Sequence, residues 1–560
     1  MRGAGLTNQA LPRKKWFLGL LLVAGLLLVF ALVSCGEEET TTTAAPSTTA
    51  ATTATTTGPT ETTASTETTT TAVQPVAGGK LRWIPPSLPQ TFYYPETGPG
   101  DQLGLTPGME RLLNLNSNRE LVPELAESIE ENPDNLTFTI HVRKGVKLHD
   151  GTELNADLVK WLLEEEKKSG KLTWGQYYDS FEIKDQYTVV AHVTQWNNIM
   201  LSGLGEVPVY SRDALEKNGV DWCRANFVGT GPFKMKEFNR DQNLVWVKNP
   251  DYWQKDKGLP YLDEIEFVFI PDMNTSKAAM EAGQMDVWTG ASAQMLSEMK
   301  AKGLTLQSAW PGSYGTLVPN IVDPNSPFQN QKVREALEYA LDREALAQAL
   351  GYGLSMPVYE LSSPGHWGYG AAAATKREYN PEKAKQLLAE AGYPNGLPVS
   401  LLAIAQAGGV NTDAEAIKGY LDAAGFQVTL DIADVGRYYG SIFGTGWKDL
   451  ALVAIFSYTQ ANDLIDFTYW WSGLAAKVKW GSWKASQELV DLFNEALTLR
   501  DMKAVEAKVG EIVALMSKDA SVCPIFYIPS YAVVQPWTHV DFPASGLIHV
   551  DWPNAWIEQH

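Results

Sequence analysis

HDGTELNAD, residues 149–157, brings one imidazole and three carboxylates together within nine residues of a 560-residue chain. The imidazole belongs to His149, and the carboxylates belong to Asp150, Glu153 and Asp157. Such a group could be a catalytic or metal-binding cluster, because these side chains transfer protons and bind cations. The same residues could equally be a tight turn followed by the start of a helix. The choice between these two readings decides whether the chain looks like an enzyme.

The order of the residues favours the turn and the helix. Asp150-Gly151 is typical of a tight turn, and Asn155 is a suitable helix N-cap. Asp157, in the first helical turn, would complement the helix dipole. The apolar face of this helix is formed by Val159, Leu162 and Leu163. Because His149 has no second ligand at metal-binding spacing, we interpret the stretch as scaffold that does not touch a ligand.

Strand-like segments surround this turn. Apolar and polar residues alternate in Thr137–Val142 and in Thr188–Val193, which is the pattern of half-buried strands. A short apolar strand is expected to begin the ordered chain near 78–83. Further strands are expected at 244–247 and 265–269. The first part of the folded chain is therefore predicted to be rich in β-structure.

After Pro327 the pattern changes to helices that alternate with buried strands. Helical spacing is found at 333–350, 381–391, 414–424 and 487–517. Strands are expected between these helices at 399–402, 427–430 and 450–453. This alternation predicts an α/β lobe with a largely parallel sheet. No internal period of 20–50 residues is evident, so a repeat architecture is not expected.

The length and the charge of the chain limit the number of domains and the kinds of partner to be expected. A chain of 560 residues is expected to form two or three domains. Its formal net charge of −20 argues against nucleic acid as a partner. The composition also includes 19 Trp, 22 Tyr and 18 Phe, which is more aromatic side chains than core packing usually demands.

Four groups of motifs resemble one family, the extracellular solute-binding proteins of ABC importers in the peptide/nickel class, family 5. They occur in the order and at about the spacing of that family, from Gly78 nearly to the end of the chain. The groups are Leu121–Ser128 with Phe138–Gly151, Val228–Phe233 with Lys248–Trp253, Tyr261–Ile265 with Met280–Val287, and Pro327–Leu337 with Ala340–Arg343.

The resemblance implies the α/β fold of periplasmic binding proteins (type II, cluster C), in which two lobes joined by two crossing strands close over a ligand. Carried over to this chain, lobe I would be 78–315 plus 525–560, with an extra subdomain near 116–225. Lobe II would be 316–524. The crossing strands would fall at 314–320 and 524–530, which are apolar and extended.

The amino end has the parts of a secretory signal. Basic residues at 13–15 precede an apolar run at 16–33, and Leu-Val-Ser-Cys at 32–35 resembles the lipobox of bacterial lipoproteins. We therefore expect a signal peptide at 1–34 and a lipid anchor on Cys35; a retained membrane-spanning helix is the alternative. Either way, the folded chain would lie outside the cytoplasmic membrane. The Thr-rich segment 35–77 is expected to be a disordered linker.

No catalytic motif is found. The chain lacks GxSxG, HExxH, a P-loop and GxGxxG, and no two of its seven His residues are spaced i, i+4. We therefore expect neither an enzyme nor a metal or cofactor site. Cys223 and Cys523 could pair in a disulfide or remain as two buried thiols.

Binding is the function that remains. A closing cleft buries its ligand by apolar contact and orients it with a few polar groups. As a set, aromatic residues near the expected hinge and strand ends favour a π-lined pocket, although each one could be ordinary packing. The candidate ligand-binding residues are Tyr94, Trp310, Tyr314, Trp367, Tyr438, Tyr458, Thr459 and Trp470.

One departure from the family concerns the charge of the ligand. Peptide binders of the family carry an Asp, after the strand that matches 450–456, which pairs with the α-amino group of the ligand. Here that region reads SYTQ at 457–460, and the next carboxylates are Asp463 and Asp466. A buried ammonium without a partner charge is costly, so a free-amine peptide requires Asp463 to reach into the site. An oligosaccharide or an uncharged organic solute would suit an aromatic pocket at least as well.

The resemblance implies a monomeric, lipid-anchored receptor that delivers its solute to an ABC permease and ATPase. The alternative is a sensory binding subunit that signals through a membrane partner. A secreted hydrolase is disfavoured by the missing catalytic motifs.

Overall fold

The computed structural model describes residues 74–560, apart from 99, 117, 173–174, 407–410, 457–461, 472, 474–479, 543–549 and 559–560, and apart from the side chains of 309–311 and 456. The predicted signal peptide, Cys35 and nearly all of the predicted linker lie outside the described residues. The description concerns the compact unit Ala72–His560. Within the described residues, no helix has the length and apolar character that crossing a membrane requires.

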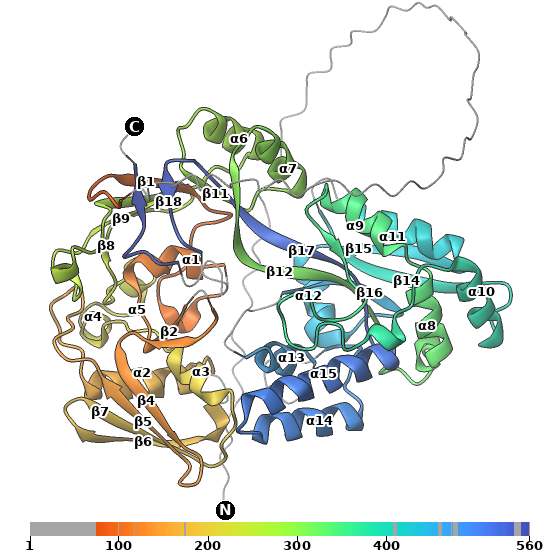
Figure 1. Cartoon of the computed structure of the whole chain (residues 1–560), viewed down its shortest axis with the longest axis horizontal. Helices are drawn as coiled ribbons and strands as arrows, with labels where there is room; N and C mark the ends of the chain where they lie inside the picture. The colour runs from red at the N-terminus through yellow and green to blue at the C-terminus, as the bar shows by residue number, and fades with distance from the viewer. Residues whose placement is uncertain are drawn as a thin grey trace, which may run out of the picture. The chain divides into compact units, whose positions relative to one another are not determined.

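One long mixed sheet runs through this unit (Figure 1). Its strand order is β15-β14-β16-β12-β17-β11-β1-β10-β9-β8, and β13 also pairs with β17. The bounds are β1 Lys80–Ile84, β8 Phe233–Asn239, β9 Asn243–Lys248, β10 Glu264–Val268, β11 Val287–Thr289, β12 Thr305–Pro319, β13 Met356–Pro357, β14 Leu397–Ile404, β15 Phe426–Ala433, β16 Leu450–Phe456 and β17 Cys523–Val534.

Strands β12 and β17 connect the two parts of the sheet. On one side they adjoin β11, β1, β10, β9 and β8, which belong to what we call the N-terminal lobe. On the other side they adjoin β16, β14 and β15, which belong to the C-terminal lobe, the part of the chain between β12 and β17 (Figure 1). Gly315 allows the two long strands to pack closely, because a Cβ there would lie 2.4 Å from the ring of Phe526. Of the two segments expected to cross between the lobes, 524–530 lies within β17, and 314–320 lies within β12 except for its last residue.

The stretch HDGTELNAD connects a strand to a helix in the N-terminal lobe. It follows β5 (Thr137–Val142), and Gly151 has φ +91° at the turn. Asn155 caps α2 (Ala156–Ser169) by accepting a hydrogen bond from the N–H of Leu158. The turn-and-helix interpretation is therefore confirmed. The four-stranded antiparallel sheet β4-β5-β7-β6 completes this region, with β4 Ala126–Asn132, β6 Tyr178–Asp185 and β7 Thr188–Val193.

His149 joins two loops as a neutral imidazole. Its Nδ1 accepts a hydrogen bond from the N–H of Gly229 at 3.3 Å, and its Nε2 donates to the carbonyl of Gly231 at 3.0 Å. Burial lowers the pKa of His149 to about 4, so the ring carries no charge at neutral pH. The imidazole that could have indicated catalysis therefore holds two loops together.

The C-terminal lobe contains a parallel arrangement. β14 pairs in parallel with β15 on one side and with β16 on the other. The chain passes from β14 through α11 (Thr412–Ala423) to β15, and then through α12 (Val435–Gly440) to β16 on the opposite side of β14. The direction of the connection thus reverses between β14 and β16, and the carboxyl ends of these strands form the usual place for a ligand in such sheets.

Two of the segments with helical spacing are helical, but each forms two helices with a short break between them. The segment 333–350 contains α8 (Gln331–Tyr339) and α9 (Arg343–Gly351), because Asp342 accepts a hydrogen bond from the N–H of Ala345 and starts a new helix. The segment 487–517 contains α14 (Gln487–Thr498) and α15 (Met502–Lys518), with Asp501 as the new N-cap. In both cases the apolar spacing continues through a break that a capping Asp makes.

The remaining elements are shorter or lie at the edges. They are α1 Gln102–Leu105, β2 Leu113–Leu115, β3 Leu121–Pro123, α3 Met200–Gly205, α4 Arg212–Asn218, α5 Val220–Cys223, α6 Met273–Glu281, α7 Ala293–Ala301, α10 Pro381–Glu390, α13 Leu464–Trp471, β18 Thr538–His539 and β19 Trp556–Ile557.

The two cysteines of the folded unit are free and buried. Cys223 lies on α5, whereas Cys523 begins β17 and accepts a hydrogen bond from Nη2 of Arg343 at 3.4 Å. Of the two possibilities left open by the sequence, the structure shows the unpaired thiols.

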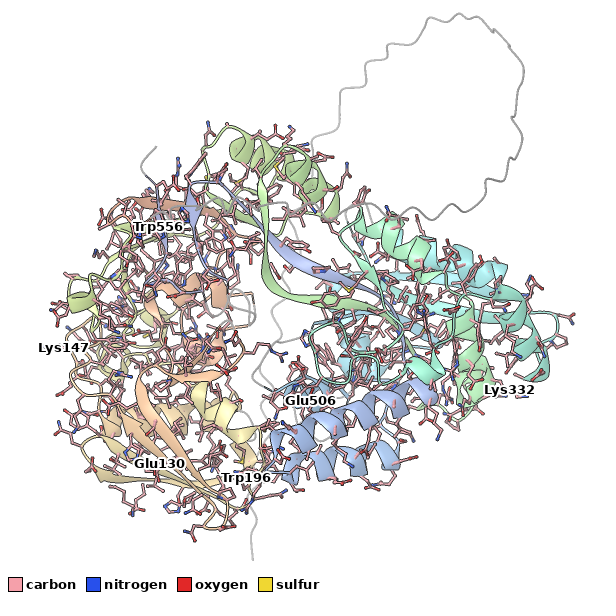
Figure 2. All side chains as sticks on the ribbon, viewed as in Figure 1. Glu130, Lys147, Trp196, Lys332, Glu506 and Trp556 are labelled. Carbon is pink, nitrogen blue, oxygen red and sulfur yellow. The ribbon has the colours of Figure 1, made fainter. Side chains whose placement is uncertain are left out.

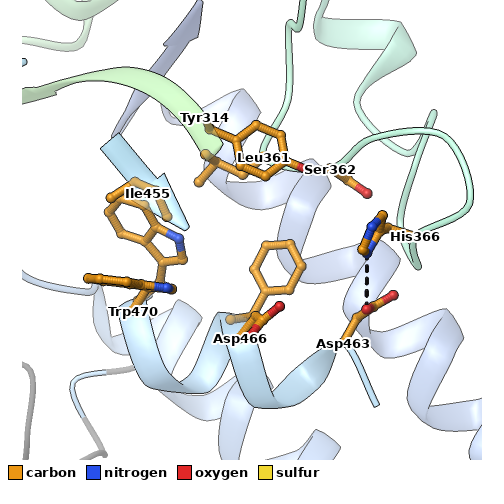
Figure 3. Close-up of a pocket in the computed structure, with 10 residues that line it drawn as sticks. Tyr314, Leu361, Ser362, His366, Ile455, Asp463, Asp466 and Trp470 are labelled. Carbon is orange, nitrogen blue, oxygen red and sulfur yellow. Dashed lines mark hydrogen bonds and ion pairs between the residues drawn. The ribbon is translucent and has the colours of Figure 1, made fainter. Parts of the chain in front are cut away.

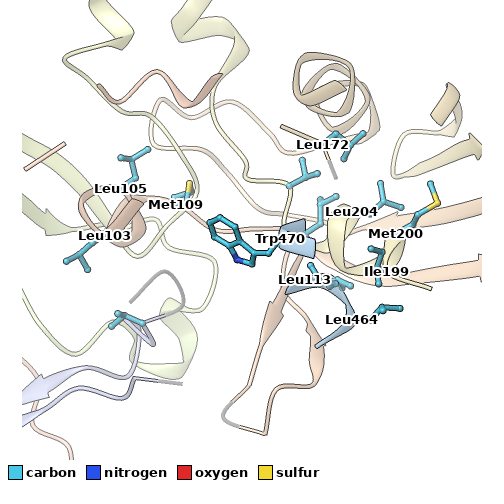
Figure 4. Packing of buried hydrophobic residues seen from close by; sticks show 14 of the residues in the cluster. Leu103, Leu105, Met109, Leu113, Leu172, Ile199, Met200, Leu204, Leu464 and Trp470 are labelled. Atoms are coloured by element: carbon cyan, nitrogen blue, oxygen red, sulfur yellow. The ribbon is translucent and has the colours of Figure 1, made fainter. Parts of the chain in front are cut away.

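Side chains from both lobes meet in one hydrophobic cluster. Leu464 and Trp470 of α13 belong to the same buried cluster as Leu113 of β2 and Ile199 (Figure 4). Trp196 lies where the N-terminal lobe approaches helices α14 and α15 (Figure 2). The structure therefore has the two lobes in contact.

Candidate functional site

A small cavity lies beside the long strands, on the C-terminal lobe. Its volume is about 30 Å³, which is room for about one water molecule. The wall combines apolar side chains with two carboxylates and one imidazole (Figure 3). The lining residues are Tyr314, Leu361, Ser362, His366, Ile455, Asp463, Asp466, Phe467, Trp470 and Trp471.

The position of the cavity follows from the topology. Ile455 lies near the carboxyl end of β16, beside the point at which the chain reverses direction around β14. Asp466 and Trp470 lie on α13, the next helix along the chain, and Tyr314 lies on β12. A strand end, a helix and a strand shared between lobes therefore converge on the ligand position expected for this kind of sheet.

Asp463 is the most heavily hydrogen-bonded group of the wall. Its side chain is 2% exposed. The Nδ1 of His366 donates to Oδ1 at 3.1 Å (Figure 3). The backbone N–H of Trp367 donates to Oδ2 at 2.7 Å. A third donor is the guanidinium of Arg119, which forms an ion pair with Oδ1.

These contacts determine the charge of Asp463. Burial alone would raise its pKa, but the hydrogen bond from His366 and the positive charge of Arg119 together lower the pKa below its ordinary value. The carboxylate is therefore ionised at neutral pH. It is also compensated entirely by groups of the chain itself.

Arg119 reaches Asp463 from the other lobe. It lies in the turn between β2 and β3 and has φ +66°, a left-handed conformation. The side chain of Asn116 shapes the turn, because its Oδ1 accepts hydrogen bonds from the N–H groups of Asn118 and Glu120, both at 2.9 Å. The ion pair therefore links residues 344 positions apart across the two lobes.

An aromatic layer supports the cavity wall from behind. The rings of Trp471 and Trp480 are stacked, with centroids 5.2 Å apart and planes 13° apart. Trp480 Nε1 also donates to the carbonyl of Trp470 at 2.6 Å, and Trp483 packs edge-on against Trp471 at 5.0 Å. The high aromatic content of the chain thus serves packing behind the cavity as well as its lining.

The structure brings some of the candidate residues together. Tyr314 and Trp470 line the cavity, and Trp367 donates its backbone N–H to the cavity carboxylate. Trp310 lies on β12 opposite Ser530, and its side chain is outside the described part of the structure. Tyr458 and Thr459 lie outside the described residues.

The other two candidates lie elsewhere. Tyr438 of α12 is 4% exposed, and its hydroxyl donates to the carbonyl of Leu452 at 2.8 Å. Tyr94 begins a short 3-10 helix, stacks on Tyr210 at 6.1 Å and lies under Nζ of Lys171. Neither residue lines the cavity around Asp463.

Sequence reasoning did not name Arg119 or His366. The sequence marks neither, since Arg119 is an isolated basic residue in a turn and His366 stands in a loop without regular spacing. The sequence gives Asp463 and Asp466 as the next carboxylates after the expected position, with Asp463 as the one that could reach into the site, and both line the cavity.

A second cavity, of about 310 Å³, lies within the N-terminal lobe. It is lined by residues from 106–257 and 550–554, among them Glu110, Glu124 and Arg143. It adjoins neither β12 nor β16, and no residue of the C-terminal lobe lines it. Its position is therefore not that of a site that closes between lobes.

The cavity near Asp463 combines polar and apolar groups. Its polar groups are the carboxylates of Asp463 and Asp466, the imidazole of His366 and the hydroxyls of Tyr314 and Ser362, and its other walls are apolar. In the described part of the chain, no group of three or more His, Cys, Asp or Glu side chains could hold a metal ion. The arrangement can therefore orient a small molecule by polar contacts and bury it against rings.

The chain matches the family model described as bacterial extracellular solute-binding proteins, family 5 Middle, over residues 120–473. It is 28% identical over 435 residues to the oligopeptide-binding protein AppA of Bacillus subtilis, covering 72% of this chain and 77% of that protein.

Solved structures share the fold. The binding protein AgaA of A. tumefaciens R10, in complex with agropinic acid, is 28% identical with a TM-score of 0.69, covering 86% of this chain and 99% of that one. The binding protein DppA of Helicobacter pylori, in complex with the peptide STSA, is 23% identical with a TM-score of 0.72 at the same coverage. This chain belongs to the bacterial extracellular solute-binding proteins of family 5 and has their two-lobed fold.

Proposed function

We propose that this protein is the extracellular receptor of an ABC importer and that it captures an organic solute between its lobes. The observation that carries the proposal is the ionised, buried carboxylate of Asp463. It lies at the carboxyl edge of the C-terminal lobe sheet and is contacted by a side chain from the other lobe. A carboxylate in this position can contact the ligand and also takes part in the contact between the closed lobes.

The mechanism follows from the connection between the lobes. Strands β12 and β17 join them, so a small change in these strands can open or close the cavity. A solute shifts the balance only if it binds the closed form more tightly than the open form. Lobe I is proposed to be 78–315 with 525–560, and lobe II 316–524.

The proposed partners are a membrane permease and its ATPase, to which the monomeric receptor delivers its solute. We propose that Cys35 carries the lipid anchor at the outer face of the membrane and that 35–77 spaces the receptor from it. The family is extracytoplasmic and consists of receptors, which supports this placement. The receptor itself is proposed to carry out no chemical step.

The solute is proposed to be peptide-like or another small organic molecule of similar size. Relatives bind an oligopeptide, agropinic acid and the tetrapeptide STSA, according to their names and complexes. The ring-lined wall of the cavity supports a ligand that has both apolar and polar parts. An oligosaccharide meets the same description.

A binding screen tests the proposal. Thermal shift and calorimetry with peptides, opines and oligosaccharides should find a solute that raises the Tm, and mass spectrometry should recover that solute unchanged. Asp463→Asn should weaken its binding, whereas Asp449→Asn should not. Asp449 is a matched control because it is also buried, and it accepts from the N–H of Ser400 near the opposite end of β16. If no solute of any class binds the wild type, the proposed function is wrong.

A further inference from the structure

We propose that Arg119 sets the specificity of this receptor. In the closed form its guanidinium occupies the Asp463 carboxylate, so the receptor selects solutes that present no free ammonium group at that position. The inference rests on the proposed function, because it concerns the same cavity. The positive charge that pairs with Asp463 would then come from Arg119 of the chain and not from the ligand.

Both carboxylate oxygens of Asp463 already accept hydrogen bonds from groups of the chain. Oδ1 accepts from Arg119 and from Nδ1 of His366, and Oδ2 accepts from the N–H of Trp367. A ligand ammonium would therefore have to compete with Arg119 for this carboxylate.

Arg119 is held in place by its own lobe. Leu113 and Leu115 of β2 are buried, and Nδ2 of Asn114 donates to Oε1 of Glu124 at 3.0 Å. The β2–β3 hairpin is thus fixed to the N-terminal lobe, and its turn carries Arg119 toward Asp463 when the lobes meet. The ion pair is consequently a contact of the closed form, where the ligand is also bound.

Exchange of the guanidinium for a ligand ammonium is unfavourable. A guanidinium presents a planar set of donors to a carboxylate, whereas an ammonium is a compact and strongly hydrated charge. The displaced Arg119, with 17% of its side chain exposed, would have to leave a largely buried position. If it stayed, two cations would share one carboxylate.

The other charged group of the wall is Asp466. It also lines the cavity, and it already takes part in an interaction of its own. His366 and Tyr314 are the remaining titratable groups that face the cavity. An experiment must therefore separate Asp463 from Asp466 as the carboxylate that would bind an ammonium.

The test compares one tetrapeptide with a free amino terminus and its N-acetylated form, by calorimetry. The readout is the ratio of the two dissociation constants for each variant. Arg119→Met keeps an unbranched side chain in place of the aliphatic part of arginine and removes the guanidinium and its charge. In this variant the free amine should gain about tenfold or more in affinity relative to the acetylated peptide. Arg119→Lys, which keeps a cation at the same left-handed position, should leave the ratio within about threefold of wild type.

Two further variants identify the carboxylate. Arg119→Met combined with Asp463→Asn should abolish the shift, whereas Arg119→Met combined with Asp466→Asn should retain it. Circular dichroism and small-angle scattering on each variant establish that it is folded and that it still closes.

Several results would overturn the inference. They are an unchanged ratio in folded Arg119→Met, a shift toward the acetylated peptide, a shift that depends on Asp466, or no binding of either peptide by Arg119→Met. A receptor that fails this test while binding another solute in the screen keeps its proposed function. Absence of any ligand for the wild type would instead count against that function.

Discussion

The backbone N–H of Asn198, in the N-terminal lobe, donates to the carbonyl oxygen of Leu497 at the end of α14 in the C-terminal lobe, at 3.1 Å. The side-chain Nδ2 of Asn198 also donates to the carbonyl oxygens of Ala496 at 2.7 Å and of Leu499 at 2.9 Å. The last carbonyls of a helix have no partner within the helix, so one residue of the opposite lobe caps the end of α14. Together with the Arg119–Asp463 ion pair, this cap joins the lobes directly.

Asn198→Ala should therefore weaken the closed form. The substitution removes two hydrogen bonds between lobes, each contributing about 1 kcal/mol. The free energy of solute binding should become less favourable by about 1–2 kcal/mol, measured by calorimetry, because binding requires closure. Scattering should show a larger radius of gyration for the variant without solute.

The matched control is Asn218→Ala. Asn218 also donates from Nδ2 to a helix carbonyl, that of Ala214 at 3.0 Å, but within α4 of one lobe. This variant should lose stability and keep the affinity of the wild type. Equal loss of affinity in both variants would show that Asn198 acts on folding alone.

Glu110 should make the protein less stable as the pH rises from 4.5 to about 8. Burial, with the nearby charge of Glu124, raises the pKa of Glu110 to about 8, although Tyr252 and Trp253 donate to its Oε1. Between its ordinary pKa of 4.5 and pH 8 the folded chain therefore holds a proton that the unfolded chain has released. The free energy of unfolding falls as the pH rises through this window.

Glu110→Gln isolates this effect, because the amide keeps the acceptor for Tyr252 and Trp253 and cannot ionise. The free energy of unfolding of the variant, minus that of the wild type, should increase by about 3 kcal/mol from pH 5 to pH 8, measured in urea. A difference that stays constant with pH would mean that Glu110 ionises normally in the folded protein.

The pH dependence of stability due to His149 should have the opposite direction. Its pKa falls from the ordinary 6.5 to about 4 because the ring is buried. Between these values the unfolded chain binds a proton that the folded chain does not, so stability decreases as the pH falls. The wild type should lose about 3 kcal/mol from this group between pH 7 and pH 4, and His149→Gln should lack that part of the slope. Parallel slopes for the two proteins would contradict the assignment of a neutral, buried ring.

The regular part of the fold could be predicted from the sequence because its signals are local. Alternation gave the bounds of β5 and β7, and the N-cap at Asn155 was expected from neighbouring residues alone. The breaks before Arg343 and Met502 were missed, because apolar spacing continues across a short interruption.

The site was predictable only in part because it is assembled over long distances. Tyr314 and Trp470 were found through their place near expected strand ends and the hinge. The contact of Arg119 with Asp463 depends on how a hairpin in one lobe meets a helix in the other. No spacing of residues along the chain predicts that contact.

Tyr438 and Trp470 were both candidates for ligand contact, and the structure predicts different outcomes for them. Tyr438→Phe removes one buried hydrogen bond to Leu452 and should cost about 1 kcal/mol of stability, with no change in solute affinity. Trp470→Leu removes part of the cavity wall and should weaken solute binding by about tenfold, the scale of a truncated aromatic contact. Calorimetry with the solute found in the screen measures both. A loss of affinity in Tyr438→Phe would place α12 in the binding site as well.

The thiols of Cys223 and Cys523 should be unreactive in the folded receptor. Both are buried, and burial raises the pKa of Cys523 to about 12, so little thiolate exists at neutral pH. A mature chain that begins after Cys35 should react with a thiol reagent at neither residue until it is denatured, and then at both. Its Tm should be the same with and without reductant, since no disulfide constrains the unfolded chain. A Tm that falls in reductant, or a denatured chain without reactive thiols, would show instead that the two cysteines pair.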